Sequence, residues 1–135
     1  YARLSGDGTL TGLLDTHGGA PAIFNERAPD AYVAGPKPCL VIAAPAQDVA
    51  LETFTETGRL ILQDVRGYAP DTGSALALDT VMRRVRTLFH NDPASLTVTG
   101  GLANISTVAG PVSSPTTDPA LIGRRVTLRL ELQET

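Results

Sequence analysis

The chain has 135 residues, 42% of them hydrophobic, which is the size and composition of a globular domain with one buried core. Its net charge of −3 and pI of about 5.2 disfavour a general nucleic-acid binder, because such domains are usually strongly basic. No apolar run approaches the roughly 20 residues that a membrane-spanning helix needs. We therefore expect a single domain, residues 1–135, that does not enter a membrane.

The N-terminal part predicts short, interrupted elements. Leucines at positions 4, 10, 13 and 14 can share one helical face, but glycines at 6, 8 and 12 weaken the helix. We expect a break at residues 6–8 and a second short helix from Thr9. Residues 22–24 are a strand candidate, and the prolines and glycine of residues 25–37 predict a loop. The chain begins at Tyr1 rather than at methionine, so we expect further residues upstream.

The middle of the chain predicts strands. The apolar run Leu40-Val41-Ile42 predicts a strand at residues 38–44 that is buried on both faces. Two further strands are expected over residues 49–57, which are rich in threonine, and residues 59–66. The glycines and proline that follow predict a loop over residues 67–73.

The clearest helix is expected over residues 72–90. Its apolar side chains recur at helical spacing and form one stripe, made of Leu78, Val81, Met82, Val85, Leu88 and Phe89. Asp71 or Thr72 can cap the first turn, and Asn91-Asp92-Pro93 can end the helix. Arginines at 83, 84 and 86 lie outside the stripe or at its edge.

The C-terminal part predicts strands around a long loop. Residues 96–98 and 102–108 are strand candidates, and residues 109–119 are rich in proline, serine and threonine and predict the loop. The last strand alternates cleanly. One face receives Val126, Leu128, Leu130 and Leu132, and the other receives Arg125, Thr127, Arg129 and Glu131. We therefore expect a half-buried strand with a charged outer face.

This order of elements predicts an α+β fold. Strands cluster and helices are interspersed, which favours an antiparallel or mixed sheet with two main helices packed on one face. We expect the core to contain Phe54, Leu78, Val85, Leu88, Leu128 and Leu130.

The sequence shows no pattern typical of a catalytic centre, and we expect no catalytic residues, no cofactor and no metal. Neither His17 nor His90 has a second ligand at metal-binding spacing. The single cysteine, Cys39, lies in an apolar run and is interpreted as a buried packing residue. The carboxylates are scattered, which favours solvated strand edges over an acid–base pair.

Arginine is the most informative residue type. The chain has one lysine, Lys37, against ten arginines, a bias that suits paired contacts at interfaces and that high-GC coding would also produce. Two groups stand out, at positions 83, 84 and 86 and at positions 124, 125 and 129. A solvated face, salt bridges to partners and contact with passing DNA all remain open for them. We expect contacts with neighbouring subunits or partners from Arg83, Arg86, Arg125 and Arg129.

Taken together, the elements resemble the phage tail terminator and tail-completion family of siphophages and phage-like gene transfer particles. The resemblance runs from Tyr1-Ala2-Arg3-Leu4 through the strand Ala22-Ile23-Phe24 and the proline-bounded strand Pro38-Cys39-Leu40-Val41-Ile42. It continues over residues 53–66, the long helix and the closing strand Arg125-Val126-Thr127-Leu128-Arg129-Leu130. Family members often have a tryptophan near the end of the middle strand, where this chain has Arg66-Gly67-Tyr68.

The resemblance implies a structural role. Copies of the chain, six in that family, would form a ring on the head-proximal end of a tail tube, stop tube growth and dock to stopper or head-completion proteins. DNA would pass through the ring lumen without specific binding, as the acidic net charge favours. The location implied is a virion or phage-like particle assembled in the bacterial cytoplasm.

Two other interpretations remain open at this point. One is a stopper or head-completion protein, which is also a small ring-forming subunit of a virion. The other is a small cytoplasmic enzyme or ligand-binding domain, which would need a pocket with convergent polar groups.

Overall fold

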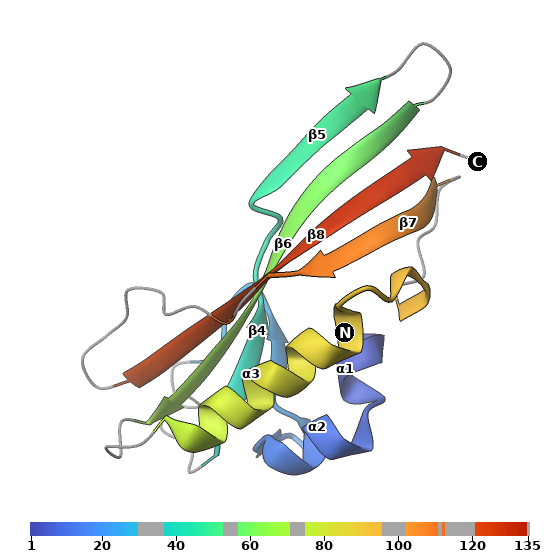
Figure 1. Cartoon of the computed structure of the whole chain (residues 1–135). Coiled ribbons are helices and arrows are strands. Elements are labelled where there is room, and N and C mark those ends of the chain that lie inside the picture. Colours follow the sequence, from blue (N-terminus) through green and yellow to red (C-terminus); the bar gives the residue numbers. More distant parts are fainter. Residues whose placement is uncertain are drawn as a thin grey trace.

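A mixed β-sheet forms the frame of the molecule (Figure 1). The computed structural model describes residues 1–29, 37–52, 57–70, 75–95, 102–110, 112 and 121–134. The strand order is β3-β4-β6-β8-β7, and β5 also pairs with β6. Strands β3 and β4 are parallel, and the other pairs are antiparallel. The strand bounds are Ile23–Asn25 (β3), Cys39–Ile42 (β4), Gln47–Glu52 (β5), Thr57–Pro70 (β6), Leu102–Ala109 (β7) and Leu121–Glu134 (β8).

Helices pack on one face of this sheet (Figure 1). They are α1 (Ala2–Ser5), α2 (Gly8–Leu13) and the longer α3 (Leu76–Phe89), which is followed by a 3₁₀ turn at Pro93–Ser95. A separate small hairpin, not predicted from the sequence, pairs β1 (Thr16–His17) with β2 (Ala20–Pro21). The predicted α+β fold is confirmed, as is the break between the two short N-terminal helices.

The core lies between α3 and the sheet. The apolar stripe of α3 is buried throughout, because it packs on the helix-facing side chains of β4, β6 and β8. Among the predicted core residues, Leu78, Val85, Leu88 and Leu128 are buried. Leu130 is only partly buried at the margin of the same core, and Phe54 lies outside the described residues.

Strand β6 is longer than predicted, and the expected loop is wrong for residues 67–70. These residues continue the strand and pair with β8 as far as Leu121. Gly67 explains the error: its backbone lies so close to α3 that a Cβ there would be 2.6 Å from Met82 Sδ and 2.8 Å from Leu78 Cδ1. The glycine therefore permits helix–sheet approach and does not make a turn.

Other boundaries also differ from expectation. Helix α3 begins at Leu76 with Ala75 as a cap that has no side-chain hydrogen bond, while both predicted caps lie outside the described residues. It ends at Phe89, one residue before the expected end at His90, and Asn91 follows in the left-handed conformation with φ 56°. Strand β5 begins at Gln47, two residues before the expected start, and Thr57 belongs to β6, while residues 53–56 of the expected strand lie outside the described residues. The strand expected at residues 96–98 and most of the loop expected at residues 109–119 lie outside the described residues.

The sheet extends well beyond the helices. Strands β6 and β8 each have 14 residues, about 46 Å of extended chain, whereas the 14 residues of α3 span about 21 Å. The part of the sheet farthest from the helices projects as an arm (Figure 1). We define the arm as β5, β7, residues 57–62 of β6 and residues 129–134 of β8. Its outer strands, β5 and β7, are both edge strands within the described sheet.

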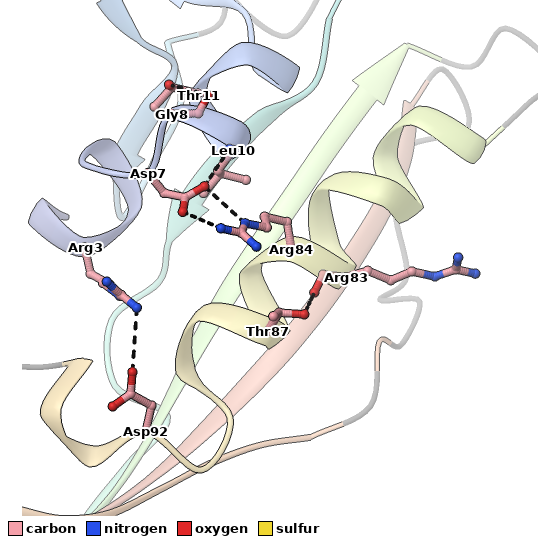
Figure 2. A network of polar contacts seen from close by, with 9 residues as sticks. All are labelled: Arg3, Asp7, Gly8, Leu10, Thr11, Arg83, Arg84, Thr87 and Asp92. Atoms are coloured by element: carbon pink, nitrogen blue, oxygen red, sulfur yellow. Dashed lines mark hydrogen bonds and ion pairs between the residues drawn. The ribbon is translucent and has the colours of Figure 1, made fainter.

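Polar contacts fix the short N-terminal helices onto α3 (Figure 2). The Asp7 carboxylate accepts two hydrogen bonds from the Arg84 guanidinium, at 3.1 and 2.7 Å, and one from the backbone N–H of Leu10, at 2.8 Å. Arg3 of α1 also lies 3.6 Å from Asp92, just beyond the end of α3. Asp7 thus both caps α2 and links it to a helix 77 positions away in the chain.

This network predicts a pH dependence. The hydrogen bonds from Arg84 and Leu10 lower the pKa of Asp7 below its ordinary value. A lowered pKa in the folded state stabilises the fold above the unfolded value, near pH 4, and this contribution disappears as the pH falls below it. We expect the urea midpoint of the wild type to fall more between pH 7 and pH 3 than that of Asp7→Asn. Parallel profiles for the two proteins would contradict this role.

Candidate functional site

The sheet face turned away from the helices carries the densest group of charges. Because successive side chains of a strand alternate between faces, the residues beside the buried Val65 and Val126 point to this second face. We call it the far face and define it by Val41, Asp64, Arg66, Tyr68, Arg125, Thr127 and Arg129. The predicted charged outer face of the last strand corresponds to part of it.

The four arginines predicted to make partner contacts are not brought together. Arg125 and Arg129 lie on the far face, on β8, whereas Arg83 and Arg86 lie on α3, on the opposite side of the sheet. They therefore belong to two separate surfaces, and each has to be considered by itself.

Three of these four arginines have contacts within the chain. Arg86 Nε donates to the Gly110 carbonyl at 3.2 Å, Arg129 lies 3.1 Å from Glu131, and Arg125 lies 4.0 Å from Asp64. Arg83 is exposed, its guanidinium has no polar partner among the described residues, and it points away from the Asp7 network (Figure 2). Of the four, Arg83 is the most available to an outside partner.

Two arginines outside the prediction are structural. Arg84 forms the forked pair with Asp7, and Arg124 Nε donates to Asp79 Oδ1 at 3.0 Å, which links β8 to α3. Neighbouring positions in the sequence thus have different roles, because residues 84 and 124 point toward another element of the same chain.

Asp64 organises the far face, and the sequence did not single it out. Its side chain is buried, with 8% exposure, and accepts a hydrogen bond from Thr127 Oγ1 at 2.6 Å. Arg66 lies 3.6 Å and Arg125 4.0 Å from the same carboxylate. A buried carboxylate normally needs such partners. The sequence around it, Gln63-Asp64-Val65, does not distinguish Asp64 from a solvated strand residue.

A pocket of about 210 Å³ adjoins this cluster. Strands β4 and β6 supply Val41, Arg66 and Tyr68, and the segment after β3 supplies a further wall. Its full lining is Glu26, Arg27, Ala28, Val41, Ala43, Arg66, Tyr68 and Leu121. The pocket is mostly apolar with charged groups at its margin.

The arm adds an apolar patch on the same side of the sheet as the far face. Val49 and Val108 are each 40% exposed, and Leu60 and Leu62 lie between them with partial exposure. Their cross-strand register places all four on one face, beside Arg129. Exposed apolar patches of this kind are typical of surfaces that contact other proteins.

The remaining reactive groups are two histidines and one cysteine. His17 stacks edge-on against Phe24, with ring centroids 5.4 Å apart, and His90 Nδ1 accepts from the backbone N–H of Ala109 at 3.3 Å. Burial raises the pKa of Cys39 to about 11, so the thiol stays protonated at neutral pH. No group of three or more His, Cys, Asp or Glu residues suited to a metal ion occurs in the part of the chain that the structure describes. None of the described helices is long and apolar enough to span a membrane.

Comparison with known proteins gives a likeness of fold. No protein-family model and no curated protein sequence matches the chain. Among solved structures, a chain from the virion of a native gene transfer agent particle is similar, with a TM-score of 0.71. The alignment covers 99% of this chain and 90% of that chain, at 13% sequence identity. The two chains therefore share a fold over nearly their whole lengths.

Proposed function

We propose that the chain is a structural protein of a phage-like particle, and specifically a tail terminator. Copies of it form a ring on the head-proximal end of a tail tube, stop tube growth and dock to head-completion proteins. The observation that carries the proposal is the fold shared, over 99% of the chain, with a chain of a gene transfer agent virion. The resemblance of the sequence to the tail terminator family, seen independently of that likeness, supports the same role.

The arm suits a subunit of a closed ring. A ring subunit presents two different surfaces to its two neighbours. The arm carries an edge strand on each side, β5 and β7, and one of its faces bears an exposed apolar patch. Edge strands carry unpaired backbone N–H and C=O groups, and burial of apolar surface is favourable. Both features therefore favour association with a neighbouring subunit.

The arginine prediction fits this arrangement as two contact surfaces. Arg83 and Arg86 would act from the helix layer, and Arg125 and Arg129 from the far face. Charge reversal at all four positions should abolish particle assembly, with Arg83→Glu sufficient to weaken it because that guanidinium has no other polar partner among the described residues. Unchanged particle yield from the fourfold variant would refute the assignment.

Deletion of the gene in a particle-producing strain, followed by electron microscopy of the lysate, tests the role itself. Abnormally long tails that are not attached to heads are the expected result, because nothing would stop polymerisation of the tube. Tails of normal length beside empty heads would instead indicate a stopper or head-completion protein. Normal, functional particles would refute a role in the virion and would direct attention to ligand binding.

A further inference from the structure

Arg66 occupies an unusual position on the far face. It lies directly opposite Arg125 in the register of β6 and β8, and like charges in such cross-strand pairs repel one another. One carboxylate, Asp64, lies between them, at 3.6 Å from Arg66 and 4.0 Å from Arg125. The group of three therefore has a net charge of +1.

The guanidinium of Arg66 has donors to spare. Its Nε is buried without a hydrogen-bond partner, and its 3.6 Å approach to Asp64 is too long for a hydrogen bond. Asp64 itself is already engaged by the Thr127 hydroxyl at 2.6 Å. The side chain of Arg66 as a whole is nevertheless 40% exposed and lines a pocket, so part of it is open to a group from outside the chain, although Nε is not.

The adjoining pocket limits what that group can be. Its volume of about 210 Å³ is below the roughly 300–1,000 Å³ of typical small-molecule sites, and suits one inserted side chain. Its walls include Val41, Tyr68 and Leu121, which favour an apolar stem. Glu26 and Arg27 also line the pocket, so the three arginines (27, 66 and 125) and the two carboxylates (Glu26 and Asp64) together still have a net charge of +1, which complements a single negative charge.

We propose that this pocket binds an acidic side chain, glutamate or aspartate, from an extended segment of a neighbouring protein. The stem of that side chain packs against the apolar walls, and its carboxylate accepts hydrogen bonds from the terminal nitrogens of the Arg66 guanidinium, since Nε is buried. The inserted residue acts as a buried anchor within a wider contact. This inference rests on the proposed function for the presence of a neighbouring protein, and it specifies the chemistry of one contact.

Two matched peptides test the pocket on the isolated protein. The probes are acetyl-Leu-Glu-Leu-amide and acetyl-Leu-Gln-Leu-amide, titrated into ¹⁵N-labelled protein with the Arg66 Nε–H and Tyr68 amide resonances as readout. We expect saturable shifts with the glutamate peptide and at least about tenfold weaker binding of the glutamine peptide, because a charged acceptor strengthens the hydrogen bonds. Equal affinities for the two peptides, or no binding of either, would overturn the proposal.

Variants and free anions complete the test. Arg66→Gln should lose the preference for the glutamate peptide, Arg66→Lys should keep part of it, and the matched surface variant Arg83→Gln should keep all of it. Thermal melting of each variant checks that the fold is intact. Sodium acetate or inorganic phosphate that bound as tightly as the peptide would show a site for free anions and would overturn a protein anchor.

The outcome is independent of the deletion experiment. Failure of the glutamate peptide to bind would remove the anchor pocket and leave the role in the virion untouched. Normal particles from the deletion strain, in contrast, would refute the role in the virion even if the peptide bound.

Discussion

Replacing Leu78 by alanine is expected to lower the free energy of unfolding by about 2–5 kcal/mol. Leu78 is 1% exposed and lies in the first turns of α3, where it packs against the sheet at Gly67. Truncation removes buried methyl groups and leaves a cavity. Because α3 and β6 already lie in close contact at Gly67, they cannot easily move together to fill it. Urea denaturation followed by circular dichroism measures the change.

Leu76→Ala is the matched control. It removes the same atoms from the same helix only two positions away, but Leu76 is 71% exposed. Its substitution should change the free energy of unfolding by less than about 0.5 kcal/mol. A comparable loss in both variants would mean that the loss does not come from the burial of Leu78 against the sheet; helix propensity cannot explain it either, because alanine is the better helix former.

Helix α3 and strand β8 were the elements most predictable from sequence. The stripe of α3 and the alternation of β8 are visible because burial on one side requires a period of 3.6 or 2 residues. Such patterns require only local information. The α+β class followed from the order of these periodic segments.

Elements that depend on distant contacts were predicted less well. Gly67 reads equally well as a turn residue or as a close-packing residue, and only the position of Met82 distinguishes the two. The arm could not be foreseen, because sequence shows that residues 59–66 form a strand but not where the helix layer stops. The far-face cluster likewise depends on the register that places Arg66 opposite Arg125.

The arginines illustrate the same limit at the level of single residues. Composition drew attention to the groups around positions 84 and 124, but it could not separate structural from available side chains. Arg84 is engaged by a carboxylate 77 positions away, while the adjacent Arg83 is exposed. One step along a helix rotates a side chain by about 100°, which is enough to exchange a partner within the chain for solvent.

Gly67→Ala tests the close approach of sheet and helix directly. The added Cβ would lie 2.6 Å from Met82 Sδ and 2.8 Å from Leu78 Cδ1, so both side chains must move. We expect a loss of about 1–3 kcal/mol in the free energy of unfolding, as is typical of overpacking. Gly12→Ala in α2 is the control, and it should raise the free energy of unfolding. Nothing lies within 4 Å of the added Cβ, and alanine favours the helix over glycine by up to about 1 kcal/mol.

A double-mutant cycle with Leu78→Ala then identifies the cause. If the cost of Gly67→Ala comes from the clash with Leu78 Cδ1, removal of that atom makes room for the new methyl group. The double variant should be more stable than the sum of the single effects by at least about 0.5 kcal/mol. Additive effects would locate the cost in the backbone of β6 or in Met82 instead, because those remain in both backgrounds. The cycle therefore decides whether the cost of Gly67→Ala comes from the contact with Leu78.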